Sequence, residues 1–350
     1  MSLIIPDKYL KNKHTHQYFF KSEDLKSINP SDVSKYNRKT YPDSLNLYTS
    51  FRNVIPYDYH LPNPKTIKHF GQLKLFIAIA DFLLLLPEPS SPDKKYTFVY
   101  AGAAPGTNIF LIEPFFRNKI KKYILVDPAK FVKPSETLNY PKVRPRYSTM
   151  ELHNSLFTDE LLDKILKNNT DIVFMSDIRG KNPRDSEVIA DNELQKNWVL
   201  KIDPLMASLK FRTPYTDFGR KDAKDTIYDG DSYPYLKGKV TFQAYAPQSS
   251  NESRLILKRP YLFKNYSISA QENRFFTFNR VYRGCAYLDP LFLVNTSNGI
   301  FDACLDCTHF YMTAKKILKN YNGGAGESVT EEAGVIKFMI DVKNILAEKL

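Results

Sequence analysis

Apolar runs and turn residues alternate through the centre of the chain. Residues 96–100 form a short apolar run rich in β-branched and aromatic side chains, which predicts a buried strand. Residues 102–106, Gly-Ala-Ala-Pro-Gly, break it, and a helix-like run follows from Thr107. A second apolar run, 123–126, ends in Asp127. This succession predicts a nucleotide-binding βαβ unit, because an acid at the tip of the second strand can accept both hydroxyls of a ribose.

The glycine turn differs from the dinucleotide fingerprint. That fingerprint needs a glycine two residues after Gly102, where the chain has Ala104, and Pro105 removes a backbone donor that a pyrophosphate would use. A nucleoside cofactor without phosphate, such as S-adenosylmethionine, fits this turn best. A phosphate-binding turn and a purely structural turn remain the alternatives.

The remaining pattern predicts one α/β domain with a central, mostly parallel sheet flanked by helices. Residues 1–56 are polar and without periodicity, so we expect an irregular N-terminal arm before a domain covering 57–350. Asn63-Pro64 is expected to begin a helix that stops before Pro87. Further helices are expected after the cap residue Thr158 and over 186–202, strands over 171–178, 205–211, 239–245 and 253–257, and mixed helix and loop from Pro260.

Four ionisable residues stand at the ends of these predicted elements: Lys74, Asp177, Lys210 and Glu252. Two lysines between two carboxylates can hold one amine near neutrality, since burial and the second ammonium lower its pKa while the carboxylates raise it. Such an amine can orient a hydroxyl and take up its proton. Two ordinary salt bridges are the alternative, because spacing along the chain does not prove convergence in space.

Net charge points to a polyanionic partner. The chain has 50 basic and 38 acidic residues, a balance of +12 that favours nucleic acid over a merely lysine-rich surface. No run of 18 apolar residues and no signal peptide is visible, so we expect a cytoplasmic protein without a membrane partner. Cys304, Cys307 and the nearby His309 are a weak zinc signal; free thiols are favoured, and no metal is expected.

Five ordered blocks carry a family resemblance that covers roughly residues 57–283. They are GQLK at 71–74, VYAGAAPGTN at 99–108, SDIRG at 176–180, DPLMASLKFRTPYTD at 203–217 and YAPQSSNESRLIL at 245–257. The chain resembles the poxvirus-type family of cap-specific mRNA nucleoside 2′-O-methyltransferases, which also serve as poly(A) polymerase stimulatory subunits. The resemblance implies a Rossmann-like fold that depends on S-adenosyl-L-methionine. A Lys-Asp-Lys-Glu tetrad in this order is the family's signature of 2′-O-methyl transfer to RNA.

The resemblance also implies roles for single residues. Lys210 would contact the reactive ribose 2′-hydroxyl, and Asp177, Glu252 and Lys74 would tune and position it. Where the family has an arginine and a histidine near the cofactor, this chain has Ala129, beside Lys130, and Asn108. The expected cofactor contacts are Gln72, Tyr100, Gly102, Gly106, Asn108, Asp127 and Asp177, with Phe157 and Thr158 near the adenine.

A pocket for the 7-methylguanosine cap is implied as well, since a cationic base stacks between aromatic rings and donates to acids. The expected cap-binding residues are Tyr57 (with Tyr59 as rival), Tyr215, Asp217 and Glu272. Arg179, Lys181, Arg212 and Arg254 would contact RNA phosphates.

Three functions follow in order of preference. The first is a cap-dependent 2′-O-methyltransferase of a virus-like cytoplasmic transcription system, acting on capped mRNA. The second is an RNA-binding stimulatory subunit that partners a poly(A) polymerase catalytic subunit. The third, a nicotinamide oxidoreductase, is disfavoured by Ala104 and Pro105 and by the basic charge.

Overall fold

The computed structural model of the protein describes only part of the chain. The described residues are 57, 70–132, 138–139, 141–180, 184–215, 230–247, 250–279, 283, 296–301, 304–321 and 331–347. The expected N-terminal arm, and with it the division into arm and domain, lies outside these residues, as do Tyr59, Lys181 and Asp217.

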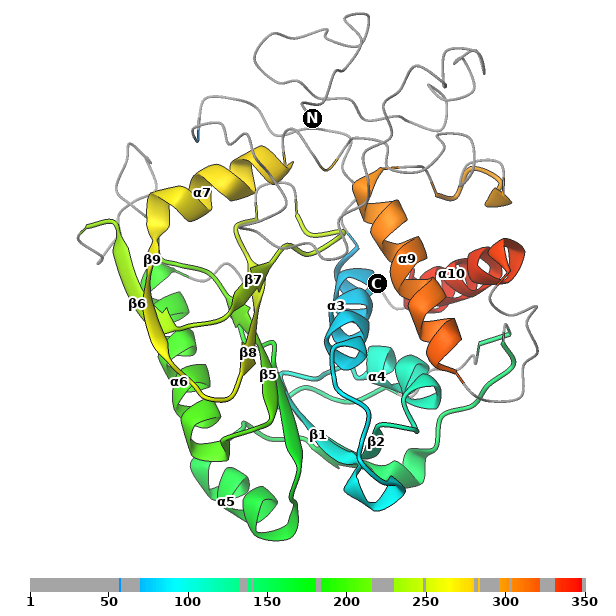
Figure 1. The fold of residues 1–350 in the computed structure, drawn as a ribbon, viewed down its shortest axis with the longest axis horizontal. Helices are drawn as coiled ribbons and strands as arrows, with labels where there is room; N and C mark the ends of the chain where they lie inside the picture. Colours follow the sequence, from blue (N-terminus) through cyan, green and yellow to red (C-terminus); the bar gives the residue numbers. More distant parts are fainter. Residues whose placement is uncertain are drawn as a thin grey trace, which may run out of the picture.

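A seven-stranded sheet runs through the centre of the molecule (Figure 1). Its order is β3-β2-β1-β4-β5-β8-β7; the first five strands are parallel, whereas β8 is antiparallel to both β5 and β7. The order reverses between β1 and β4, the topological switch point where open α/β sheets bind ligands. The expected Rossmann-like α/β class is therefore confirmed. The strands are β1 Tyr96–Ala101, β2 Ile120–Val126, β3 Met150–His153, β4 Ile172–Ser176, β5 Met206–Phe211, β7 Lys239–Thr241 and β8 Ser253–Lys258.

Helices cover both faces of the sheet. One apolar cluster packs α3, α4, α9 and α10 against it, and a second packs α5, α6 and α7 on the opposite face. Phe98 and Tyr100 of β1 belong to the first cluster, whereas Val99 and Ala101 belong to the second. This two-sided burial explains why the strand is apolar throughout. The helices are α3 Gly71–Leu84, α4 Thr107–Ile112, α5 Asp159–Asn168, α6 Asp185–Ile202, α7 Ile268–Thr277, α9 Leu305–Asn320 and α10 Glu332–Ala347, with 3₁₀ turns at Pro92–Lys94, Glu113–Phe115 and Tyr147–Thr149.

The structure corrects several predicted boundaries. Helix α3 begins at Gly71, because Phe70 is in an extended conformation, so a helix running unbroken from Asn63 is wrong. The strand expected over 239–245 ends at Thr241, and Tyr245 has a positive φ of 58°.

A second, two-stranded sheet was not predicted. It pairs β6 (Ser232–Leu236) with β9 (Phe263–Ser267), so the expectation of mixed helix and loop from Pro260 is wrong over β9. Pro234 stands in the middle of β6 and hides the strand pattern, because proline is confined to edge strands.

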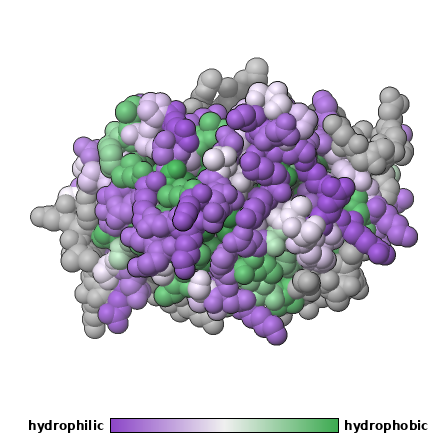
Figure 2. Space-filling model, turned by 90° about the horizontal axis from the view of Figure 1, so that it is seen from below, coloured by the Kyte–Doolittle hydropathy of each residue, from purple (hydrophilic) through white to green (hydrophobic). Residues whose placement is uncertain are grey.

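The outer surface carries mostly polar side chains where Figure 2 shows it. That face, seen from below, is largely hydrophilic, with hydrophobic residues scattered between the polar ones. Within the described residues, no helix is long and apolar enough to cross a membrane.

The glycine turn after β1 lies directly against the end of β4. Gly102 has a φ of +82°, and its N–H donates to the carbonyl of Val126 at 2.8 Å. A Cβ on Gly102 would stand 2.9 Å from the backbone carbon of Asp177. Both the backbone conformation and the close approach therefore require glycine here. The expected proximity of Asp177 to this turn is confirmed.

We expect Gly102→Ala to lower the free energy of unfolding by about 2 kcal/mol, because a side chain is strained at positive φ and would collide with β4. The measurement is urea unfolding followed by circular dichroism. Gly180→Ala is the matched control, since nothing lies within 4 Å of a Cβ there. Equal stability of the two variants would contradict the geometry.

Candidate active site

The four expected charged residues meet at one edge of the sheet. Lys210 Nζ lies 3.7 Å from Asp177 Oδ1 and 3.7 Å from Glu252 Oε2. Lys74 Nζ lies 3.9 Å from the same Glu252 oxygen. The structure thus brings together residues that are up to 178 positions apart in the sequence, 252 minus 74. We call Lys74, Asp177, Lys210 and Glu252 the charged tetrad.

Strand pairing explains this convergence. Lys210 is on β5 and lies opposite Arg254 of β8 in the antiparallel register, so Glu252 comes just before β8 at the same edge. Asp177 follows β4, the strand next to β5. Lys74 is in the first turn of α3, which packs across these strands. The Gln195 side chain donates to the carbonyl of Lys210 at 3.1 Å and fixes the strand below the amine.

Two arginines complete the cluster, and they pair crosswise. Arg254 donates to Asp177 Oδ1, to the carbonyl of Ser176 at 3.0 Å and to Gln243 Oε1 at 3.1 Å. Arg179 Nε lies 3.7 Å from Glu252 Oε1, and its Nη1 lies 3.2 Å from Asp191 Oδ2. Each arginine stands two residues after one tetrad carboxylate and contacts the other.

These contacts fix the charge states at the site. Burial alone would raise the pKa of Asp177, but Arg254, Lys210 and Lys74 lower this pKa to about 2. Burial lowers the pKa of Lys74, with Lys210 and Arg254 adding to the effect and Asp177 and Glu252 opposing it. Four basic side chains, those of Lys74, Lys210, Arg179 and Arg254, thus face the three carboxylates of Asp177, Glu252 and Asp191. This surplus of basic groups favours a developing oxyanion or an anionic ligand.

The turn expected to bind a cofactor is tied to Asp127. Its carboxylate accepts from the backbone N–H of Ala104 at 3.0 Å and from that of Ala129 at 2.8 Å. Both oxygens keep a second acceptor position for the hydroxyls of a ribose. Asp127 therefore connects the loop after β2 to the glycine turn after β1.

Asn108 and Gln72 form a second polar pair beside the turn. Asn108 Nδ2 donates to Gln72 Oε1 at 2.8 Å. Asn108 is 5% exposed, and its Oδ1 atom is buried without a hydrogen-bond partner among the described residues. A buried acceptor of this kind is costly unless a ligand supplies the donor. Tyr100, also expected at the cofactor, is fully buried at the end of β1, where burial raises its pKa.

The two residues expected near adenine have different surroundings. The ring of Phe157 lies 4.7 Å from that of Trp198, inside the core beneath α6. Thr158 is exposed and caps α5 by accepting from the backbone N–H of Leu161 at 3.3 Å. The capping prediction is confirmed, and the side chain of Phe157 stabilises the packing of α6 on the sheet.

Three of the residues expected at the cap lie within the described part of the chain. The Tyr57 N–H donates to Asn273 Oδ1 at 2.7 Å on α7, and its ring lies 5.4 Å from that of Phe276. Tyr215 follows β5, and the guanidinium of Arg212 lies 4.0 Å from its ring centroid. Glu272 lies on α7 and is 6% exposed. These contacts do not test an aromatic sandwich around the cap, which remains a prediction.

Of the basic residues expected to bind RNA, the three that the structure describes are not displayed on the surface. The side chains of Arg179 and Arg254 are each 3% exposed, and that of Arg212 is 6% exposed and paired with Asp185 at 2.7 Å. Their guanidinium groups are bonded within the protein, so a phosphate contact would require these pairs to open. The sequence alone predicted an RNA surface at these arginines, because their internal partners are set by strand pairing.

The Cys304, Cys307 and His309 segment has other contacts. Tyr245 Oη donates to Cys307 Sγ at 3.2 Å, and His309 Nε2 lies 2.6 Å from Asp81 Oδ2. Within the described ranges, no group of three potential metal ligands is found.

We expect Arg254→Met to lower the free energy of unfolding by about 3–5 kcal/mol, because it leaves a buried carboxylate without its nearest cation. The stabilisation from the depressed pKa of Asp177 is present above the unfolded pKa of 3.8 and is lost as pH falls through about 2. The variant should raise that pKa, so its acid unfolding should begin at higher pH. Unfolding between pH 2 and 7 measures both effects.

Arg259→Met is the matched control, because Arg259 pairs with Asp203 at 3.2 Å but is 48% exposed. If both arginine variants unfolded alike across this pH range, the buried pair of Arg254 and Asp177 would not be the stabilising contact.

The chain matches the family model described as poly A polymerase regulatory subunit over residues 24–339. It is 32% identical over 206 residues to the cap-specific mRNA (nucleoside-2′-O-)-methyltransferase of fowlpox virus (strain NVSL), covering 57% of this chain and 62% of that protein. The myxoma virus (strain Lausanne) protein of the same name is 28% identical over 202 residues, covering 55% of this chain and 54% of that protein. The chain thus spans less than two thirds of the length of these relatives.

Among solved structures, bluetongue virus VP4, described as a multifunctional RNA-capping production line, has 13% sequence identity and a TM-score of 0.42. The match covers 75% of this chain and 41% of the bluetongue virus chain. At this TM-score the similarity carries no argument about function. The family model, in contrast, covers most of the sequence, including every tetrad residue. The chain therefore belongs to the poly A polymerase regulatory subunit family, as its sequence blocks indicated.

Proposed function

We propose that the protein is an S-adenosyl-L-methionine-dependent cap-specific mRNA 2′-O-methyltransferase. It would transfer a methyl group to the ribose 2′-hydroxyl of the first transcribed nucleotide of 7-methylguanosine-capped RNA. The observation that carries the proposal is the position of Lys210 Nζ near the carboxyl end of β5, 3.7 Å from both Asp177 and Glu252. The names of the fowlpox and myxoma relatives support the same activity.

The residues around the glycine turn fit the proposed cofactor. Gly102 lets the turn lie directly against the backbone of Asp177, and the buried Oδ1 of Asn108 can accept from the ammonium of an amino-acid tail. Asp127 would hold the ribose hydroxyls, while Gln72 would position Asn108. Tyr100, Gly106, Thr158 and Asp177 would line the remainder of the site. When bound, the cofactor would supply an electrophilic methyl group on a sulfonium.

Lys210 would act on the hydroxyl itself. Its amine, held by Asp177 and Glu252, is positioned to bond the 2′-oxygen and to take up the hydroxyl proton at Nζ. Asp177 stays ionised at neutral pH because its pKa is about 2, so it fixes the amine without competing for that proton. Lys74 would position Glu252, since its Nζ lies 3.9 Å from the Glu252 oxygen that also contacts Lys210. Most of the acceleration would come from holding two reactants in line.

Capped RNA would enter beside α7. Tyr57 contacts α7, Glu272 lies on α7 and Tyr215 follows β5; we retain them, with Asp217, as the proposed cap contacts. The net charge of +12 supports binding of a polyanion, while the buried arginines of the cluster would act through the site's positive potential.

We expect Lys210→Met to reduce methyl transfer by at least about 10²-fold, since it removes the group that orients the hydroxyl and accepts its proton. Transfer of a radiolabelled methyl group to short RNA with and without a 7-methylguanosine cap measures the activity. Nuclease mapping of the modified sugar identifies the position.

Lys201→Met is the control, because Lys201 lies at the far end of α6 and pairs with Asp163 at 2.8 Å. Binding of S-adenosylhomocysteine should be the same for both variants. Undiminished transfer by Lys210→Met, or equal labelling of capped and uncapped RNA, would rule out the proposed function.

A second function is favoured by the family's description as a regulatory subunit of poly A polymerase. We propose that the chain also stimulates a poly(A) polymerase catalytic subunit. The full chain should then bind that subunit in a pull-down and lengthen its products in a poly(A) extension assay. The Lys210→Met variant should stimulate poly(A) extension as strongly as the unaltered chain, because the tetrad is proposed to serve methyl transfer alone. If the unaltered chain neither bound nor stimulated the catalytic subunit, this second function would be ruled out.

A further inference from the structure

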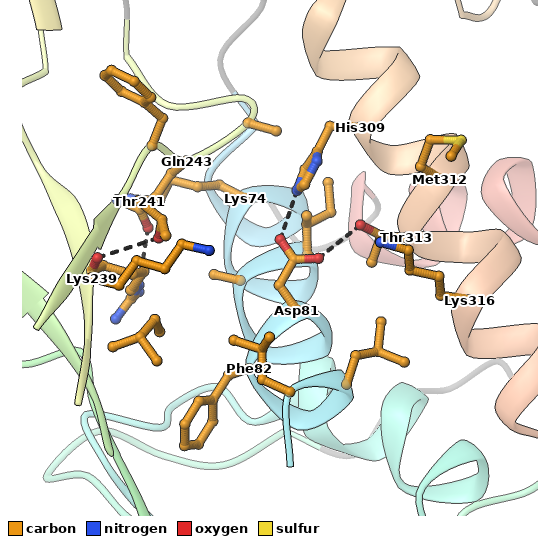
Figure 3. A pocket seen from close by; sticks show the side chains of 18 residues that line it. Lys74, Asp81, Phe82, Lys239, Thr241, Gln243, His309, Met312, Thr313 and Lys316 are labelled. Carbon is orange, nitrogen blue, oxygen red and sulfur yellow. Dashed lines mark hydrogen bonds and ion pairs between the residues drawn. The ribbon is translucent and has the colours of Figure 1, made fainter. Parts of the chain in front are cut away.

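A pocket of about 410 Å³ lies beside the charged tetrad and outside the proposed cofactor site. It is enclosed by α3, by β7 and β8, and by α9, three segments that are distant in sequence (Figure 3). Of the proposed catalytic, cofactor and cap residues, Lys74 alone lines this pocket, together with Arg254 of the cluster. The volume is in the range of small-molecule sites in proteins.

Most of the wall is apolar. Ile77, Ala78 and Phe82 face the pocket from α3, Ile256 faces it from β8, and Met312 faces it from α9. A flat ring placed here would bury both of its faces against hydrocarbon and the soft thioether. The wall therefore suits an aromatic ring.

The charged groups at the pocket are mainly cations. Lys239 of β7 and Lys316 of α9 line it from opposite sides, in addition to Lys74 and Arg254. Lys316 is exposed and forms no ion pair with any residue that the structure describes. Burial lowers the pKa of Lys239, and nearby Lys258 lowers it further, so positive charge is crowded on this side. An anion would relieve that repulsion.

One carboxylate faces the same space and is held in place. Asp81 of α3 lies 2.6 Å from His309 Nε2 and accepts from Thr313 Oγ1 at 2.8 Å, as the dashed lines of Figure 3 show. Each of its oxygens keeps a second acceptor position. Asp81 is therefore an acceptor of fixed orientation, suited to an amino group on a ring.

From these features we infer that the pocket binds a nucleotide whose base carries an amino group. The base packs on the apolar wall with its amino group toward Asp81, and the phosphate is held by the ammonium groups of Lys239 and Lys316. The nucleotide is either free in solution or a unit of an RNA chain, since the recognising chemistry is the same for both. This inference does not depend on the proposed methyl transfer.

Cytidine 5′-monophosphate is the probe, because it joins a small ring and an amino group to a phosphate. Binding is measured by calorimetry on the full chain, and the pocket is located through the ¹³C-methyl signal of Met312. We expect that signal to shift with the mononucleotide if the natural ligand is a free nucleotide, and with a short cytidylate RNA if the ligand is a unit of an RNA chain. Cytidine alone should bind at least about tenfold more weakly, since it lacks the group that meets the lysines.

Charge-reversed variants test the phosphate contacts. The double variant Lys239→Glu/Lys316→Glu should bind the probe at least about tenfold more weakly. Lys315→Glu is the matched control, because Lys315 is exposed on the same helix and does not line the pocket. Ala78→Trp should abolish binding, because the larger side chain fills the pocket without a change of charge. A thermal melting curve shows whether this variant is folded.

Three results would overturn the inference. The first is an unchanged Met312 signal with both the mononucleotide and the RNA, which needs no variant to interpret. The second is equal weakening by Lys315→Glu and by the double variant, which would show a diffuse surface attraction. The third is undiminished binding by a folded Ala78→Trp protein.

Discussion

The crossed ion pairs around Asp177 and Glu252 are the constraint on which the site depends. Burying two carboxylates costs free energy unless cations compensate them. Here Arg254, from the segment of Glu252, compensates Asp177, and Arg179, from the segment of Asp177, compensates Glu252. Because each arginine contacts the carboxylate of the other segment, the pairs connect the end of β4 to the start of β8. The two lysine amines are then held at fixed distances by carboxylates that cannot turn away. The positive charge at the site is a consequence of the packing of the sheet edge.

The sheet topology explains why such a cluster forms here. The parallel strands bring the turn after β1 and the residue after β4 to one edge, and the antiparallel β8 delivers Glu252 and Arg254 to that same edge from the opposite direction. A fully parallel sheet would place the start of β8 at the other end of the molecule. The reversed strand is therefore as necessary to the site as the switch point itself. The second apolar cluster contributes as well: Trp198 packs on Phe157 and holds α6 against the sheet, and α6 carries Asp191, the partner of Arg179.

Much of the fold could be predicted from the sequence for local reasons, whereas the convergence of the tetrad was expected from the family resemblance, because spacing along the chain did not distinguish it from two ordinary salt bridges. Buried strands such as β1 and β4 are uniformly apolar, Thr158 is a clear cap, and Asp177 follows an apolar run directly. The interior role of Arg179 and Arg254 could not be separated from a surface role, because their partners are set by which strands pair and not by neighbouring residues. Strands β6 and β9 were not predicted from the sequence. Pro234 interrupts the pattern of β6, and polar residues fill β9, so the two strands form because they pair with each other in the folded protein. The pocket beside α3 left no sequence signal, for its lining comes from three separate segments.

Lys74 connects the two regions of the molecule that these arguments single out. It contributes a charge to the tetrad through Glu252, and its side chain also borders the pocket between α3, β8 and α9. An anion in that pocket would favour the charged form of Lys74, whose pKa burial otherwise lowers. A more fully charged Lys74 would in turn add positive potential at Glu252, the carboxylate that also contacts the amine of Lys210. Binding in the pocket and binding at the tetrad would then be linked through a single helix turn, and by the reciprocity of linkage a ligand at the tetrad would alter the affinity of the pocket by the same factor.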